Sequence, residues 1–315
     1  MNTDFKTLLE ITEYVADPKR AHDLAVGLRW PQGVACPRCG DMAVTFLAKY
    51  YRWKCNGCKQ QFTVKVGTLM EDSPLPIKKW MVACWLVTNA KNGISSCELG
   101  RSIGVCQKTA WFVLHRVREG MRFEYSEVLP GPVEADETYI GGKAKNKHAS
   151  KNKHDRGVKG KEIVMGILQR AKEQEASKIR AKVIQNTSKS TLQGEIRANV
   201  EPGAALYTDA HAGYQGLSAD LEHAWVDHLV SYAEGAVHTN GCENFWNLFK
   251  RMLGGTYTHV DPRHLQGYID EEVCRFNNRK GDDLERFVST VQGMDRKRLT
   301  YEQLTERGLL AMLPK

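Results

Sequence analysis

Two kinds of segment are missing from this sequence. No run of 18 uninterrupted apolar residues occurs in the 315-residue chain, and the mean hydropathy is −0.47, which excludes a membrane span. The first residues, Met1 to Lys6, lack a basic stretch followed by an apolar one, so no secretory signal is expected. In a chain without export, the nine cysteines are expected to be thiols and metal ligands rather than disulfides.

The composition is that of a globular protein, with charge of one sign concentrated in one region. Hydrophobic residues at 42% and charged residues at 26% exclude a largely disordered or fibrous chain, and the length allows more than one domain. Residues 1–120 hold 17 Lys and Arg against 10 acids, whereas residues 121–315 hold 28 against 27. The first third is therefore predicted to meet a polyanion.

Four of the cysteines have the spacing of a zinc site. Cys36 and Cys39 form one CxxC pair, and Cys55 and Cys58 form a second pair after 15 intervening residues. The residues between and after the pairs alternate like strands, which predicts a zinc ribbon at 31–70 behind a helical segment at 1–30. Cys84, Cys97, Cys106, Cys242 and Cys274 lack ligand spacing and are expected to be small buried hydrophobes.

The pattern after the ribbon changes to helical period. A short helix begins at Ser95 or Ser96, Gly104 forms a turn, and a second helix spans 107–118. This order predicts a DNA-binding helix-turn-helix within 71–128, although three-helix bundles that bind no DNA share the pattern. The second helix is expected to expose its DNA-contact residues, which are Gln107, Lys108, Thr109 and Arg116.

A different composition follows the boundary at 129–132. Strands are predicted at 133–140, 162–168, 177–184, 204–209 and 228–232, with a helix at 190–199. Three strands, a helix, a strand and further helices is the order of the ribonuclease H-like fold, which predicts a mixed-sheet catalytic domain at 129–280 and a helical tail at 281–315. The basic stretch 143–161 is either a charged loop or a DNA contact. The predicted class is multidomain α/β.

That element order places acidic residues together. Asp136 lies within the first strand, and Asp209 ends the fourth, which is its neighbour in that fold. Glu243 lies near the start of a predicted helix at 239–251, where Asn240, Glu243, Asn247 and Lys250 share one face and apolar residues share another. Oxygen ligands of this kind suit Mg²⁺ or Mn²⁺, and two such ions can act on a phosphodiester.

Several motifs together carry a resemblance to a known family. The sequences CPRCG, VEADETYIGGK, YTDAHAGY, HTNGCENFWNLFKR and EEVCRFNNRK resemble those of insertion-sequence transposases of the IS1595 kind, over roughly residues 20 to 280. These are DDE-type enzymes with an N-terminal zinc ribbon. The resemblance implies that Asp136 is the first catalytic acid, Asp209 the second and Lys250 the following lysine.

The third catalytic position stays open between two residues. The family has Glu or Asn there, and this chain offers both Glu243 and Asn240. Glu243 is preferred because a carboxylate supplies charge that an amide lacks, whereas Asn240 could instead cap the helix.

The resemblance implies a metal-dependent transposase of a prokaryotic-type cell, located in the cytoplasm with the nucleoid. It would bind the terminal inverted repeats of a mobile element, cleave the DNA ends and join the 3′ ends to target DNA. Since two ends are joined, a homodimer or larger assembly on DNA is expected. The alternatives are a zinc-ribbon transcription regulator whose second domain is not catalytic, and a structure-selective nuclease that does not join ends.

Overall fold

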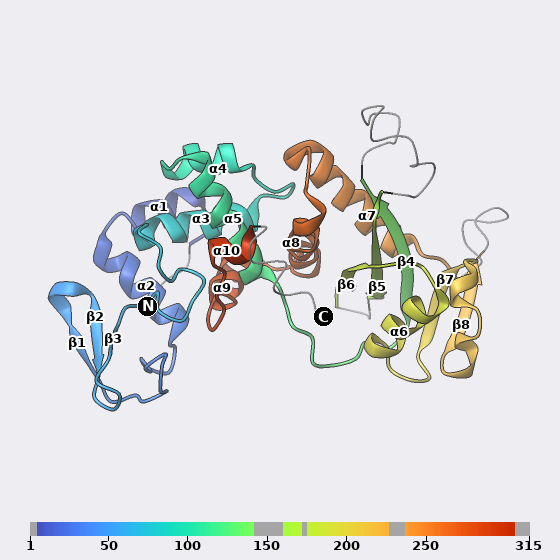
Figure 1. The fold of residues 1–315 in the computed structure, drawn as a ribbon, viewed down its shortest axis with the longest axis horizontal. Coiled ribbons are helices and arrows are strands. Elements are labelled where there is room, and N and C mark those ends of the chain that lie inside the picture. Colours follow the sequence, from blue (N-terminus) through green and yellow to red (C-terminus); the bar gives the residue numbers. More distant parts are fainter. Residues whose placement is uncertain (1–4, 142–159, 172–174, 227–236, 306–315) are drawn as a thin grey trace. The chain divides into compact units, whose positions relative to one another are not determined.

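The computed structural model describes residues 5–141, 160–171, 175–226 and 237–305, which form two compact units. Unit 1 combines residues 1–123 with residues 281–315, and unit 2 is the continuous stretch 124–280 (Figure 1). The predicted strand at 228–232 and most of the basic stretch, residues 143–159, lie outside the described residues. Among the described helices, none is long and apolar enough to cross a membrane.

Unit 1 contains a three-stranded antiparallel sheet and seven of the described α-helices. The strands, in the order β1-β2-β3, are Val44–Leu47, Arg52–Cys55 and Gln61–Phe62. The helices are α1 (Leu8–Tyr14), α2 (Pro18–Arg29), α3 (Ile77–Asn89), α4 (Ser96–Ile103), α5 (Gln107–Met121), α9 (Asp283–Gln292) and α10 (Tyr301–Leu304). Ser95 caps α4 by accepting a hydrogen bond from the Glu98 N–H, and Gly104 ends that helix in the left-handed conformation.

The small sheet packs one face on α2. Trp53 and Phe62 are buried on this face with stacked rings, and the His22 ring of α2 stacks on Trp53 at a centroid distance of 5.2 Å. Alternation along the strands turns the intervening side chains outward.

The two chain segments of unit 1 share one core. The Thr88 hydroxyl of α3 donates a hydrogen bond to the Thr290 hydroxyl of α9 at 3.2 Å, and the Leu69 N–H bonds the Met294 carbonyl at 3.1 Å. A Cβ on Gly120 would lie 2.7 Å from Met294 Cγ, so only glycine lets α5 approach this closely. Segments far apart in sequence therefore complete one packed unit.

Unit 2 is built on a five-stranded mixed sheet in the order β6-β5-β4-β7-β8. The strands are β4 (Val133–Ile140), β5 (Glu162–Gln169), β6 (Lys178–Ile184), β7 (Ala205–Asp209) and β8 (Glu222–Val226). The helices are α6 (Lys189–Asn199), α7 (Asn240–Met252) and α8 (Leu265–Asn277). Strands β4, β5 and β6 pair antiparallel, whereas β7 and β8 continue the sheet in parallel from β4.

Two separate cores cover the faces of this sheet. Val133 and Ala135 of β4 pack with Leu192 and Ile196 of α6, whereas Val164 of β5 packs with residues of α7 and α8. Strand β8 was not predicted from the sequence. Among its five residues only Val226 is buried, so it lacks the run of buried apolar residues that marks β5.

Candidate active site and zinc site

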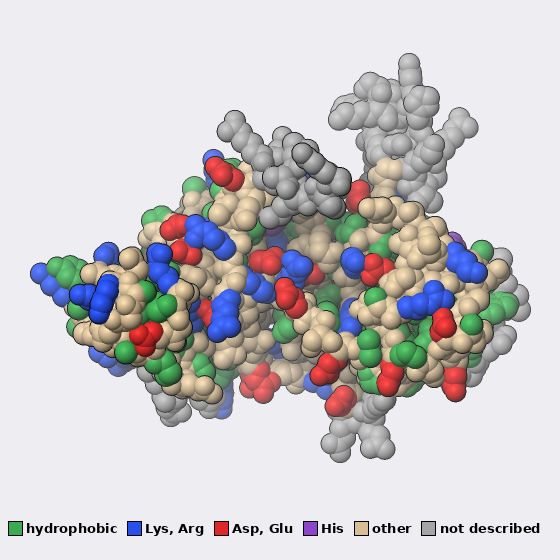
Figure 2. Space-filling model, turned by 60° about the horizontal axis from the view of Figure 1, so that its bottom comes forward, with side chains coloured by type: hydrophobic (Ala, Val, Ile, Leu, Met, Phe, Trp, Pro, Cys, Tyr) green, Lys and Arg blue, Asp and Glu red, His purple; other side chains and the backbone are tan. Residues whose placement is uncertain are grey.

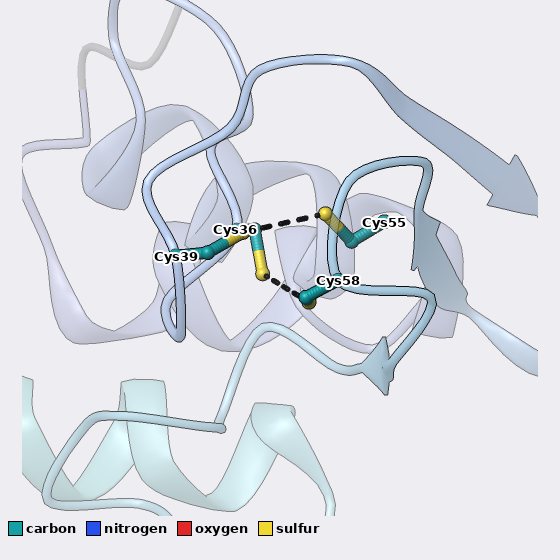
Figure 3. Close-up of side chains that lie close together, drawn as sticks. All are labelled: Cys36, Cys39, Cys55 and Cys58. Carbon is teal, nitrogen blue, oxygen red and sulfur yellow. Dashed lines mark hydrogen bonds between the residues drawn. The ribbon is translucent and has the colours of Figure 1, made fainter.

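The four predicted zinc ligands lie together in unit 1 (Figure 3). Their Sγ atoms are all within 4.8 Å of one another, with Cys36 to Cys58 at 3.7 Å and Cys39 to Cys55 at 3.6 Å. A tetrahedral zinc ion with Zn–S bonds of about 2.3 Å needs sulfur atoms roughly 3.8 Å apart. The thiols therefore fit a closed four-cysteine zinc site.

Backbone turns aim the thiols at one point. The Gly40 N–H bonds the Cys36 carbonyl at 2.8 Å, and Gly40 has a φ of +79°, which favours glycine. In the second turn, a Cβ on Gly57 would lie 2.4 Å from an Asp41 carboxylate oxygen, so the Asp41 side chain would have to move to admit it. Gly40 thus has the left-handed conformation that the first turn requires.

In unit 2, Asp136 and Asp209 lie on neighbouring parallel strands. Val133 pairs with Leu206 and Glu134 with Tyr207, and continuing this register brings Asp136 to the level of Asp209. Adjacent strands are about 4.8 Å apart, so the two carboxylates share one end of the sheet. Their mutual repulsion contributes to the raised pKa of Asp136.

The Asp136 carboxylate is half-buried and held from two sides. It accepts hydrogen bonds from the Glu137 N–H at 2.9 Å and from Trp246 Nε1 on α7 at 3.0 Å. Burial, followed by the nearby Glu137 charge, raises the pKa of Asp136 to about 7. Gly166, its cross-strand partner on β5, leaves room for the Trp246 ring, since a Cβ there would lie 2.7 Å from that ring.

A further acid at this end of the sheet, Glu137, was missed from the sequence. Its carboxylate accepts a hydrogen bond from the Tyr214 hydroxyl and lies 3.9 Å from His211 Nδ1. Burial raises the pKa of Glu137, and the Asp209 charge adds to the shift. Asp209 itself accepts the His211 N–H at 3.1 Å. In the sequence, Glu137 directly follows Asp136 in the segment ADE, and this pair of adjacent acids was the signal by which Glu137 could have been found.

Glu134, also missed, anchors the start of α7 to the sheet. Its carboxylate is almost fully buried and accepts the N–H groups of Gly241 at 2.8 Å and Cys242 at 3.1 Å. Arg170 Nε donates to its other oxygen at 2.8 Å, which balances the charge. One strand thus carries both Asp136 and the anchor of the helix that carries Glu243.

This anchor corrects the capping hypothesis for Asn240. Thr239, not Asn240, is the N-cap residue of α7, and it makes no side-chain capping bond. Asn240 is the first helical residue and is exposed, because Glu134 satisfies the helix N–H groups from β4. The hypothesis that Asn240 caps the helix is therefore wrong.

The remaining α7 residues follow the predicted faces. Cys242, Phe245, Trp246 and Phe249 are buried, whereas Asn240, Asn247 and Lys250 are exposed and Glu243 is half-buried. The four cysteines are the only set of three or more candidate ligands that the described residues bring within 4.8 Å of one another. Asp136, Asp209 and Glu243 are not gathered to that spacing, and the third catalytic position stays a prediction.

Comparisons with known proteins agree on one family. The ISXO2-like transposase domain matches residues 128–277, and the transposase zinc-ribbon domain matches residues 17–61. An uncharacterised protein in the transposable element ISH50 of Halobacterium salinarum is 26% identical over 276 residues, which cover 83% of this chain and 91% of that protein. An uncharacterised transposase-like protein of Haemophilus influenzae is 33% identical over 102 residues, covering 32% of this chain and 82% of that protein. The chain belongs to the IS1595 family of transposases. No solved structure matches it.

The two matched domains of the transposase coincide with the sites described above. The zinc-ribbon match contains all four cysteines, and the transposase-domain match contains Asp136, Asp209, Glu243 and Lys250. The predicted zinc ribbon and the predicted family are confirmed.

Elsewhere in the transposase, the structure corrects the predicted exposure of Arg116. Its side chain is 7% exposed, and its guanidinium donates to the carbonyls of Leu299 and Glu71, each at 3.1 Å. These partners come from distant parts of unit 1, so Arg116 braces the unit and is unavailable to DNA. Gln107 and Lys108 are exposed on the first turn of α5, and Thr109 is half-buried there.

Two of the five remaining cysteines of the transposase also differ from expectation. Cys84, Cys242 and Cys274 are buried, as predicted. Cys97 and Cys106 are exposed, because the first turns of α4 and α5 face solvent there.

Proposed function

We propose that the protein is a metal-dependent DDE transposase that cleaves DNA at the terminal inverted repeats of its element and joins the 3′ ends to target DNA. The observation that carries the proposal is the pair Asp136 and Asp209, which lie on the neighbouring strands β4 and β7 inside the transposase domain, close enough for the Asp209 charge to contribute to the raised pKa of Asp136. The sheet order β6-β5-β4-β7-β8, with α6 on one face and α7 and α8 on the other, supports a ribonuclease H-like fold.

The acidic residues fit Mg²⁺ or Mn²⁺. Both ions take hard oxygen ligands, and a half-buried carboxylate whose pKa is raised to about 7 by desolvation and by neighbouring acids gains stability from a bound cation. Asp136 and Asp209 would hold the ions, with Glu243 preferred over Asn240 as the third ligand. When bound, two ions supply an activated attacking oxygen and stabilise the departing 3′ oxygen.

Residues of α7 would position the site and the DNA strand. The Trp246 indole and the Glu137 N–H each hold one Asp136 oxygen, and the remaining lone pairs of that carboxylate would bind the ions. Lys250 is exposed and lies seven residues after Glu243, about 10 Å along the helix axis. From there its ammonium group can contact a phosphate near the cut.

Unit 1 would bind the element ends. Residues 1–120 carry 17 basic residues against 10 acids, and α4, Gly104 and α5 have the order of a helix-turn-helix. Gln107, Lys108 and Thr109 on the first turn of α5 would contact DNA, with Arg116 excluded by burial. Zinc would fix the ribbon fold, and joining two ends would require a dimer or larger assembly at the nucleoid.

A strand-transfer assay tests this function against its alternatives. Purified protein, Mn²⁺ and duplex DNA from the flanks of its own gene should give cleaved ends and products joined to a second duplex. Asp136→Asn should abolish both while leaving end binding intact, because it removes one negative charge from the metal ligands. End binding without cleavage by the wild-type protein would indicate a regulator, and cleavage without joined products would indicate a nuclease.

A further inference from the structure

The zinc ribbon presents an unpaired basic face on its β1–β2 hairpin. Thr45 pairs with Lys54 and Leu47 pairs with Arg52, so these four side chains share the face opposite the buried Trp53. Arg52 and Lys54 are exposed, and neither makes a side-chain ion pair or hydrogen bond within the described part of the chain. Figure 2 shows Lys and Arg side chains beside hydrophobic ones over the ribbon.

The ribbon contains far fewer acidic than basic residues. Elsewhere in the unit, Lys19 pairs with Asp23 at 2.7 Å and Arg298 pairs with Glu71 at 2.7 Å. Residues 31–66 instead contain six Lys and Arg and one acid, Asp41, whose carboxylate accepts the Ala43 N–H. Neighbouring positive charges without local compensation are favourable when a polyanion is bound.

The turn of the hairpin adds one aromatic side chain beside a lysine. Tyr50 is 60% exposed in the turn that joins β1 to β2, whereas the Tyr51 ring lies 4.9 Å from the His22 ring of α2. Lys49 Nζ lies 5.5 Å from the Tyr50 ring centre, so an ammonium and a phenol are presented together. Lysine and tyrosine are both frequent donors to DNA phosphates.

The width of the hairpin suits a groove of duplex DNA. Strand β3 pairs with β2 only at Trp53 and Lys54, so the half of the hairpin nearer its turn is two-stranded. A two-stranded ribbon with strands about 4.8 Å apart fits the major groove of B-DNA, which is about 12 Å wide.

We propose that the outward face of the β1–β2 hairpin, with Arg52 and Lys54 at its centre, binds duplex DNA in the major groove. This inference rests on the proposed function, and it makes the hairpin a second DNA-contact element in addition to α5. The hairpin supplies phosphate contacts through its basic residues, while the opposite face of the ribbon stays packed on α2.

The test uses the full-length protein and duplexes from both flanks of its gene, with binding measured by fluorescence anisotropy across a salt series. Arg52→Ala/Lys54→Ala should weaken binding about tenfold or more and reduce the salt slope by about two, because two phosphate contacts are lost. The charge-matched control Lys78→Ala/Lys91→Ala removes two exposed, unpaired lysines outside the ribbon. It should bind within about twofold of wild type. Zinc content and circular dichroism show that each variant is folded.

Several outcomes overturn the proposal. An unchanged salt slope in the folded hairpin variant excludes the contact, and equal losses in both double variants indicate general electrostatics. Equal loss on single-stranded DNA or duplex RNA of the same sequence excludes groove binding. The variant Lys108→Ala separates the two proposals. If both Lys108→Ala and the hairpin variant bind DNA more weakly than wild type, both proposals are supported. If only Lys108→Ala binds more weakly, the hairpin proposal is excluded and the proposed function stands, whereas a wild-type protein that does not bind DNA excludes both.

Discussion

The two units of this transposase are assembled from the chain in different ways. Unit 2 uses the continuous stretch 124–280, whereas unit 1 uses residues 1–123 and then 281–315. In unit 1, α9 fills a core whose other walls come from α3 and α5, through Phe287 and Thr290, and Met294 follows just after the helix. A fragment that ends at residue 120 would lack this wall, so unit 1, the proposed DNA-binding unit, also needs the segment that begins at residue 281.

The two units are also stabilised locally by different groups. In unit 1 the ribbon is held by the cluster of four cysteines, whereas in unit 2 the buried Glu134 carboxylate holds the start of α7. A substitution in one of these groups should therefore lower the stability of its own unit and leave that of the other unchanged.

The largest effect is expected from loss of the zinc ligands. Cys39→Ser/Cys58→Ser should remove the bound zinc and unfold the ribbon, since structural zinc contributes about 10–16 kcal/mol in comparable sites. Elemental analysis should give one zinc per wild-type chain and none in the variant, with the thermal transition of unit 2 unchanged. Zinc-free wild-type protein, or a variant with an intact ribbon, would contradict the assignment.

A second prediction concerns activity in unit 2 alone. Glu243→Gln should lower strand cleavage at least about a thousandfold, equivalent to about 4 kcal/mol, because a charged ligand is lost. Asn240→Ala is the matched variant one turn earlier and should retain substantial cleavage, since Asn240 is exposed and does not cap the helix. Both variants should still bind end DNA through unit 1. If instead Asn240→Ala abolished cleavage and Glu243→Gln retained it, Asn240 would be the third catalytic residue.

A third prediction concerns the Glu134 anchor. Glu134→Ala leaves Arg170 and two helix N–H groups without their buried partner, which should cost about 3–5 kcal/mol. Urea unfolding of unit 2 should show this loss, with zinc content unchanged. Glu222→Ala, an exposed acid on β8, is the control and should have little effect. Equal stability of the two variants would show that Glu134 does not anchor the helix.

A fourth prediction tests the shared core of unit 1. Met294→Ala should cost about 2–5 kcal/mol, because a fully buried side chain against Gly120 and Cys84 is removed. Met42→Ala serves as control, since Met42 lies in the same unit and is 60% exposed. Thermal unfolding should lower the transition of unit 1 only. No difference between the two variants would mean that the C-terminal segment does not complete this core.

The smallest effect is expected from pH and divalent metal in unit 2. The pKa of Asp136 is raised to about 7, so its contribution to stability is greatest at low pH and is lost as pH rises through 7. A cation offsets this loss by neutralising the ionised carboxylate. At pH 8, Mn²⁺ at ten times its dissociation constant should raise the free energy of unfolding of unit 2 by about 1.4 kcal/mol and its melting temperature by about 3–6 °C. The gain should be smaller at pH 5.5 and absent in Asp136→Asn; equal gains at both pH values would exclude Asp136 as a ligand.

Sequence patterns predict the parts of this protein whose signals are local. The CxxC spacing places all four thiols, and the strand predicted at 133–140 has the observed bounds of β4, Val133–Ile140. Patterns fail where a side chain meets a distant partner. Glu134 bonds an N–H 107 residues later, and Arg116 bonds a carbonyl 183 residues away, so neither environment is visible in nearby residues.

The return of the chain to unit 1 imposes an order on its synthesis. A ribosome delivers the whole of unit 2 before it delivers α9, so unit 2 can fold while the core around α3 is still missing a wall. The ribbon and the first helices emerge earliest, yet their unit is completed last. A nascent chain interrupted before residue 283 therefore contains all of unit 2, whereas its unit 1 still lacks α9.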